Sequence, residues 1–226
     1  MASNIYIIGG SKGGVGKSLV TMATANYLKE QGDDMLLIET DTSNEDVWKS
    51  CHDSIDMELV DLDEADGWIQ LVNLCDSNRD RIVVINTAAR NNKGVSAYGD
   101  TLNSTLVDLE RKLVTLWVIN RQRDSLELLK EYMDALPNSD IHVVCNGYYG
   151  ALRKFELYNN SNLRTEVEKR GGLTLLFPDL ADRVADDLYN RRLSIEAALK
   201  ELPMGNRAEL IRWRNEARKM LDEVMK

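Results

Sequence analysis

Residues 10–18 read Gly10-Ser11-Lys12-Gly13-Gly14-Val15-Gly16-Lys17-Ser18, which nearly fills the Walker A frame G-x-x-x-x-G-K-[ST]. Gly16, Lys17 and Ser18 supply the second half of the frame, whereas Ser11 stands where the frame expects its first glycine. The apolar run Ile5–Ile8 precedes this segment, and an apolar pattern at helical spacing follows it. A strand, a glycine-rich loop and a helix in this order are typical of a phosphate-binding loop.

The residue types of this loop suit a polyanionic ligand. Glycines let the backbone bend so that N–H groups point at phosphate oxygens, and a helix N-terminus adds a partial positive charge. We expect Lys17 to reach the terminal phosphates and the Ser18 hydroxyl to hold Mg²⁺. The competing interpretation is a glycine turn before a surface helix, which does not account for the spacing, the Lys-Ser ending and the flanking pattern together.

Lys12 is an additional lysine inside the loop, and it makes the segment resemble the deviant Walker A motif of the ParA/MinD family of dimeric ATPases. The resemblance implies that Lys12 reaches across a nucleotide-sandwich dimer to the partner's ATP. From the residues alone, Lys12 is a cation beside a polyanion site, and a solvated loop lysine is the alternative. The resemblance further implies ATP contacts from Gly13, Gly14, Val15, Gly16, Lys17, Ser18 and Leu19.

Length and composition limit the possible classes of protein. The 226 residues suffice for one α/β domain, expected over residues 1–226. We expect no transmembrane helix and no signal peptide, because the apolar runs are too short. Three widely spaced cysteines and two histidines offer no zinc spacing and fit a reducing cytoplasm. A net charge of −9 argues against a protein that coats nucleic acid over its whole surface.

Acidic residues are concentrated in residues 53–66, which contain no Lys or Arg. A solvated loop and strand edge is the first interpretation of this segment, and a docking surface for a basic partner is the alternative.

Short apolar runs, rich in Ile, Val and Leu and mostly not alternating with polar residues, predict strands buried on both faces. Helical patterns lie between most of them, so we predict an α/β fold of the P-loop NTPase type, with a doubly wound, mainly parallel sheet flanked by helices. Met57–Leu62 is a further, more exposed candidate strand. The six principal runs are Ile5–Ile8, Met35–Ile38, Ile82–Ile85, Val114–Ile119, Ile141–Cys145 and Leu173–Phe177.

Polar residues follow these runs, and the carboxyl ends of parallel strands are where ligands bind. Asp41 follows the second run and matches the second acid of the family's Asp-x-Asp segment, while Glu39 replaces the first acid. The resemblance implies that Asp41 helps to position the attacking water and the Mg²⁺ shell. An N-cap for a helix near Glu45–Lys49 is the alternative role for Asp41.

Asn86 stands where the family places the Walker B aspartate, which is the largest departure from its pattern. An amide can hydrogen-bond a Mg²⁺-bound water but brings no charge, so we expect weak Mg²⁺ binding and slow hydrolysis. An Asn86→Asp change is then expected to lower the Mg²⁺ requirement. Residues 87–100, with Arg90 and Lys93, resemble a mobile switch II loop, and a plain surface loop is the alternative.

Asn146 ends the fifth run and matches a family asparagine that pairs with adenine, because an amide offers a donor and an acceptor together. Pro178 and Asp179 match the loop that closes over the base. Turn formation is the alternative role for Asn146 and for Asp179.

Residues 207–226 predict a long helix with one apolar stripe. We expect the stripe to pack on the sheet. Membrane contact, as in MinD-like relatives, and DNA contact through Arg212, Arg214, Arg218 and Lys219 are the alternatives. The stripe consists of Leu210, Trp213, Ala217, Met220, Leu221 and Val224.

The pattern as a whole favours a dimerising, ATP- and Mg²⁺-dependent switch that hydrolyses ATP to ADP and phosphate. The segments after the second and third runs resemble the plasmid StbB or TraL-like branch, which implies partition, positioning or conjugative transfer. The implied partners are a second copy of the chain, an unidentified adaptor or DNA-binding protein, and non-specific DNA. A small-molecule kinase or ligase, and an ATP-holding scaffold that scarcely hydrolyses, remain the alternatives.

Overall fold

The computed structural model describes residues 3–10, 13–89 and 91–225. Seven strands form one sheet in the order β3-β2-β4-β1-β5-β6-β7, and every neighbouring pair is parallel. This arrangement confirms the predicted sheet, including the additional strand that begins at Met57, although that strand ends at Leu59 and not at Leu62. The strands are β1 (Ile5–Gly10), β2 (Met35–Glu39), β3 (Met57–Leu59), β4 (Ile82–Asn86), β5 (Leu113–Ile119), β6 (Ser139–Asn146) and β7 (Thr174–Phe177).

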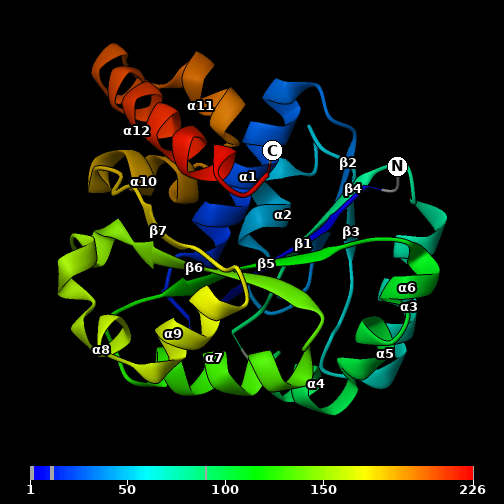
Figure 1. The fold of residues 1–226 in the computed structure, drawn as a ribbon. Helices are drawn as coiled ribbons and strands as arrows, with labels where there is room; N and C mark the ends of the chain where they lie inside the picture. Colours follow the sequence, from blue (N-terminus) through cyan, green and yellow to red (C-terminus); the bar gives the residue numbers. More distant parts are fainter. Residues whose placement is uncertain (1–2, 11–12, 90, 226) are drawn as a thin grey trace.

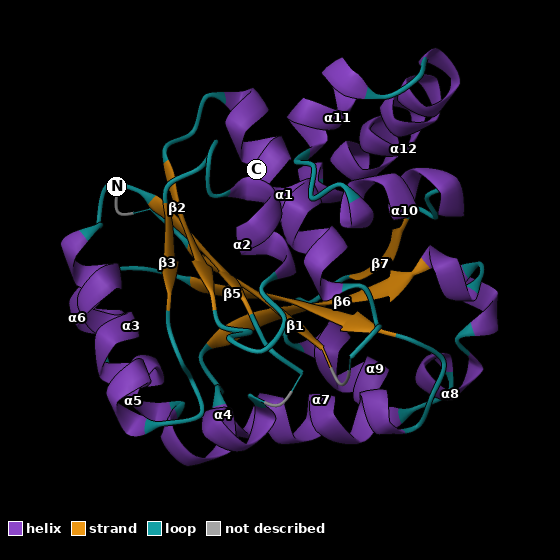
Figure 2. Cartoon of the chain, turned by 180° about the vertical axis from the view of Figure 1, so that it is seen from behind, coloured by secondary structure: helices purple, strands orange, loops and turns teal. Residues whose placement is uncertain are grey.

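Helices cover both faces of the sheet (Figures 1 and 2). The layer that is uppermost in Figure 1 contains α1 (Lys17–Gln31), α2 (Asp46–Cys51), α10 (Asp182–Asn190), α11 (Ile195–Glu201) and α12 (Met204–Asp222). The opposite layer contains α3 (Ala65–Ser77), α4 (Asn92–Tyr98), α5 (Asp100–Asn103), α6 (Leu106–Leu109), α7 (Asp124–Ala135), α8 (Glu156–Asn159) and α9 (Asn162–Lys169).

Each face of the sheet has its own hydrophobic core, because successive side chains of a strand point to opposite faces. Tyr6 and Ile8 of β1 pack in the core beneath α1 and α12, whereas Ile5 and Ile7 pack in the core beneath α3 and α7. The central strands are therefore apolar at nearly every position, and this explains why the sequence shows runs rather than alternation.

The C-terminal helix packs in the core, as expected from its apolar stripe. Five of the six stripe residues are buried in α12, and Val224 packs against the same core just beyond the helix. Arg212 is bound to Glu209 and Glu216, and Arg214 is bound to Glu30, so these two cations are already paired within the chain. In the described part of the chain, every helix is too short or too polar to traverse a bilayer.

Residues 87–100 do not form the single loop that the sequence predicted. Half of this segment is helix α4 (Asn92–Tyr98), although its composition gave no apolar periodicity. Tertiary packing overrides the weak local preference: Val95 is buried, and Gly94 lies so close to Leu62 that an added Cβ would stand 1.9 Å from its carbonyl oxygen. Arg90 lies outside the described residues.

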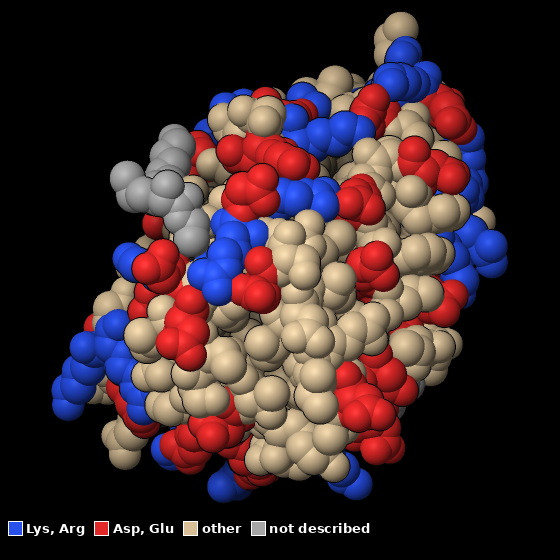
Figure 3. Space-filling model, turned by 90° about the vertical axis from the view of Figure 1, so that its right-hand side faces the viewer, with Lys and Arg blue, Asp and Glu red and all other residues tan. Residues whose placement is uncertain are grey.

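The acidic segment 53–66 is largely solvated, as expected. Its carboxylates are exposed except for Asp63, which is partly buried, while the apolar Val60 and Leu62 between them turn into the core. Figure 3 views the side of the molecule on which α3, α5 and α6 lie, and acidic side chains there are interspersed with basic and uncharged ones. The cysteines Cys51, Cys75 and Cys145 are all buried thiols.

Candidate nucleotide-binding site

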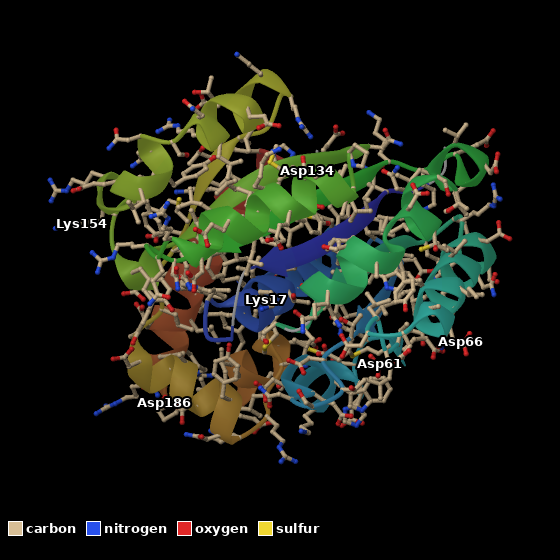
Figure 4. All side chains as sticks on the ribbon, turned by 90° about the horizontal axis from the view of Figure 1, so that it is seen from below. Lys17, Asp61, Asp66, Asp134, Lys154 and Asp186 are labelled. Carbon is tan, nitrogen blue, oxygen red and sulfur yellow. The ribbon has the colours of Figure 1, made fainter. Side chains whose placement is uncertain are left out.

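A cleft of about 400 Å³ lies where the loop after β1 meets the carboxyl ends of β2 and β4. Figure 4 shows Lys17 near the centre of the molecule, with the other labelled side chains farther out. Residues from the three segments at the ends of β1, β2 and β4, together with Tyr189 of α10, thus converge at one edge of the sheet, as predicted for a single ligand pocket. The lining residues are Gly13, Gly14, Gly16, Lys17, Ser18, Asp41, Asn44, Asp46, Asn86, Thr87, Ala89 and Tyr189.

The glycines of the loop are required by its backbone. Gly14 and Gly16 adopt φ values of 79° and 103°, which L-residues with a Cβ rarely adopt. A Cβ on Gly16 would also stand 2.3 Å from Nδ2 of Asn146. Gly16 is the N-cap of α1. Because glycine has no side chain that could accept hydrogen bonds from the first N–H groups of the helix, Gly16 leaves these groups available to a ligand. The loop therefore forms a cradle for an anion, while the Val15 side chain anchors it in the core.

Lys17 is the main cation of the described cleft lining, and it is only 8% exposed. Burial lowers the pKa of its ammonium group to about 8, although the charges of Asp41 and Glu39 act in the opposite direction. A desolvated cation of this kind interacts strongly with an anionic ligand, since a phosphate would replace the hydration that burial has removed.

Asp41 lies at the rim of the cleft, and its side chain organises a turn. Its Oδ1 accepts hydrogen bonds from the backbone N–H and hydroxyl of Ser43 and from the backbone N–H of Asn44. The N-cap role suggested as an alternative is wrong, because α2 begins at Asp46 with Glu45 as its N-cap. The turn fixes one carboxylate oxygen of Asp41 beside the phosphate loop.

Asn86 is almost fully buried, and its amide is held at both ends. Its Nδ2 donates to both carboxylate oxygens of Glu39, at 2.9 and 3.1 Å, and its Oδ1 accepts from the Thr21 hydroxyl at 2.8 Å. Burial raises the pKa of the Glu39 carboxyl to about 7, whereas hydrogen bonds from the Asp41 N–H and from Asn86 lower it. In the sequence, Glu39 is visible only as a replacement of the family's first acid, and Thr21, which lies one helical turn after Lys17, belongs to no motif.

A second cleft of about 500 Å³ adjoins the first and shares Gly14, Gly16 and Tyr189 with it. It brings together the three residues expected around a base, Asn146, Pro178 and Asp179, together with Leu19. The Asn146 amide also serves turn formation, since Nδ2 donates to the Val15 carbonyl and Oδ1 accepts from the Tyr148 N–H.

Helix α12 holds the loop on the far side of this second cleft. Trp213 Nε1 donates to the Pro178 carbonyl at 2.9 Å, and Arg212 Nη2 donates to the Asp179 carbonyl at 3.1 Å. The C-terminal helix is therefore part of the support of the pocket as well as of the core.

The structure also places residues at the site that the sequence did not indicate. The Tyr149 hydroxyl donates to the Gly14 carbonyl, and Tyr189 lines both clefts. Asn91 is 1% exposed and joins two loops, because it accepts from the Thr40 hydroxyl and donates to Asp63. Tyr149 and Tyr189 stand in no recognisable motif, and Asn91 lies in the 87–100 segment, where nothing in the sequence distinguishes it from its neighbours. Lys12 lies outside the described residues.

Comparisons with known proteins agree with this geometry. Residues 6–146 match the family described as the CobQ/CobB/MinD/ParA nucleotide binding domain. The chain is 72% identical to Protein MobD of Acidithiobacillus ferrooxidans over 225 residues, covering 100% of this chain and 99% of the relative.

Two solved structures share the fold at 14% identity. The chain resembles one in the MinC:MinD cell division protein complex of Aquifex aeolicus with a TM-score of 0.60, over 99% of this chain and 98% of that one. It resembles the ParA family ATPase of Chlorobium tepidum with a TM-score of 0.53, over 95% and 98%.

Proposed function

The chain belongs to the CobQ/CobB/MinD/ParA nucleotide-binding family, and from this premise we propose that residues 1–226 form one ATP-dependent switch. The switch dimerises with ATP, hydrolyses it slowly to ADP and phosphate, and works in the cytoplasm through partner binding. The observation that carries the proposal is the buried Lys17, which lies in a glycine cradle at the N-terminus of α1 and faces polar groups from two strand ends.

The residues of the cleft suit Mg²⁺-bound ATP. Backbone N–H groups of the 13–16 loop and the Lys17 ammonium would bind phosphate oxygens. The hydroxyl of Ser18 and the carboxylate of Asp41 are oxygen donors of the kind that Mg²⁺ prefers, and Asn86 would contact its water shell. When bound, Mg²⁺ neutralises phosphate charge. Asp41, fixed by its turn, would orient the attacking water.

The adenine would occupy the second cleft, between Asn146 and the loop at Pro178 and Asp179. One amide hydrogen and one lone pair of Asn146 remain beyond its two hydrogen bonds in the protein, and this suits a base edge. Hydrogen bonds from α12 hold the loop, which keeps the cleft shaped before the nucleotide binds.

The proposed dimer and the proposed biological process are inferred from related proteins. The role of Lys12 across the dimer follows from the ParA/MinD resemblance. The curated relative's name, MobD, suggests mobilisation, so we place the switch in plasmid mobilisation, partition or conjugative transfer. The occurrence of a structural neighbour in a MinC:MinD complex supports a protein partner, an adaptor or DNA-binding protein. DNA contact remains a secondary part of the proposal, because Arg212 and Arg214 are paired within the chain.

A barely hydrolysing ATP-holding scaffold is the second candidate. The neutral amide of Asn86, where the family places an aspartate, favours it. Single-turnover assays that include partner proteins separate the two candidates, because a scaffold stays slow in every mixture whereas a switch is accelerated by its partner.

The direct test of nucleotide binding is calorimetry of Lys17→Ala with ATP and Mg²⁺. We expect loss of at least about 10-fold in affinity, because the change removes a charge-assisted contact to phosphate. Lys29→Ala is the matched control, since Lys29 lies on the same helix and pairs with Glu196 at the surface. Unchanged affinity in Lys17→Ala would exclude the phosphate-loop role.

A further inference from the structure

Glu39 is a carboxylate with no exposed surface, although it ends a strand beside a polar cleft. Burying a charged group is costly unless it is paired or hydrogen-bonded. Its partners are specific: Asn86 Nδ2 donates to both of its oxygens, and the Asp41 N–H donates to Oε1 at 2.8 Å. Glu39 therefore contacts the backbone or side chain of two residues that line the phosphate cleft, without lining the cleft itself.

Strand register places this carboxylate behind Asn86. Glu39 of β2 and Asn86 of β4 are direct partners across adjacent parallel strands, at the carboxyl end of each. The third residue of this network is Thr21, whose hydroxyl oxygen lies 2.8 Å from Asn86 Oδ1 and 3.0 Å from the Lys17 carbonyl oxygen. Its single hydrogen is shared between these two acceptors. A continuous line of hydrogen bonds thus runs from the lysine helix through Asn86 to Glu39.

The order of donors and acceptors fixes the orientation of the Asn86 amide. When Glu39 is ionised, its carboxylate only accepts hydrogen bonds, so the NH₂ group faces Glu39 and the carbonyl oxygen faces Thr21 and the lysine helix. Donation to a carboxylate also polarises the amide, which makes its Oδ1 a stronger acceptor.

We infer that Glu39 is a positioning residue that supplies, through Asn86, the negative charge of the Mg²⁺ shell at the end of β4. The inference rests on the proposed function, because it assigns a role toward Mg²⁺-bound nucleotide. In this chain the negative charge belongs to Glu39 on β2, and it is separated from the cleft by the neutral amide of Asn86, to which Glu39 is hydrogen-bonded.

The pairing revises what the sequence suggested for Asn86→Asp. That single change would set a second carboxylate against Glu39 within hydrogen-bond distance and remove the donor that Glu39 uses. It is therefore expected to lower the midpoint of urea denaturation and not to ease Mg²⁺ binding. Glu39→Gln combined with Asn86→Asp keeps the net charge and the hydrogen bond, and moves the carboxylate to residue 86.

The test measures the Mg²⁺ concentration that half-saturates binding of a fluorescent ATP analogue, mant-ATP, to the full chain. We expect Glu39→Gln to raise this concentration about 10-fold, the lower end of the range for groups that support a metal site, because Asn86 stands at the water shell. The mant-ATP affinity in EDTA should change less than about twofold. The double exchange should restore the wild-type Mg²⁺ requirement. Glu58→Gln is the matched control, because Glu58 is an exposed glutamate on neighbouring β3.

A Mg²⁺ requirement of Glu39→Gln equal to that of wild type, with only the urea midpoint lowered, would show a purely structural carboxylate and overturn the inference. Failure of the double exchange to restore the requirement would overturn it as well. If Glu39→Gln does not fold, the variant that combines Glu39→Gln with Asn86→Asp tests the inference by itself. A wild-type Mg²⁺ requirement in that variant supports the inference, and a raised requirement contradicts it. A wild-type chain that binds no mant-ATP, with or without Mg²⁺, would instead remove the proposed function and the inference with it.

Discussion

At the residue scale, the phosphate cleft is built from the buried cation Lys17 and from hydrogen bonds behind it that link Asn86 to Glu39. The loop motif alone located Lys17 and Ser18, because their spacing is tied to one kind of ligand. Glu39 and Asn86 were visible only as two separate departures from a family pattern. Their pairing depends on β2 and β4 being neighbours in register, and the order of strands in a sheet is not written in any single segment.

A substitution at Asp41 can distinguish the role of its negative charge from its role in the turn. Asp41→Asn keeps an oxygen that can accept from Ser43 and Asn44, but it removes the carboxylate charge. If Asp41 orients the attacking water, this variant should bind ATP normally and release phosphate at least about 100-fold more slowly. Ser43→Ala is the control, because it loses one hydrogen bond to Asp41 and retains the charge. Normal phosphate release by Asp41→Asn would leave Asp41 with the turn alone.

At the scale of elements, buried strands were predicted well and the segment after β4 was not. Strands buried on both faces must be apolar at nearly every position, so each left a clear run in the sequence. Helix α4 owes its form to the close approach of Gly94 to Leu62 and to the burial of Val95, which are contacts between segments far apart in the chain. Local composition carries no record of such contacts.

Helix α12 connects the core to the loop over the second cleft, and Trp213 makes the connection testable. Trp213→Phe keeps an aromatic ring beside Phe177 but leaves the Pro178 carbonyl without its donor. We expect a loss of about 1–3 kcal/mol in the free energy of unfolding, measured in urea. If the loop contacts the base, ATP affinity should fall several-fold as well.

Ile211→Ala gives the comparison for Trp213→Phe, because Ile211 lies on the same helix but is 42% exposed. ATP affinity that falls equally in both variants would show that α12 affects the cleft only through general stability. If Trp213→Phe bound ATP with the affinity of wild type, the 178–181 loop would have no role in nucleotide binding.

At the scale of the whole molecule, the sequence predicted the fold class and the edge of the sheet where the ligand pocket lies. Alternating runs and helical patterns imply a doubly wound sheet, and such a sheet gathers its strand ends at one edge. The shape of the pocket could not be predicted, since it depends on α10 and on the 178–181 loop, which α12 holds by hydrogen bonds. The structure of one chain does not show how two chains would assemble. ATP-dependent dimerisation is nevertheless the central claim of the proposed function.

Light scattering of the full chain without nucleotide, with ADP and with ATP plus Mg²⁺ tests that claim most directly. A nucleotide-sandwich switch should have the mass of one 25.6 kDa chain without nucleotide and with ADP, and twice that mass with ATP and Mg²⁺. Lys12→Ala should bind ATP as a monomer and weaken the shift, whereas Lys29→Ala should dimerise like wild type. The same mass under all three conditions, or an ATP-driven dimer that Lys12→Ala leaves intact, would contradict the account.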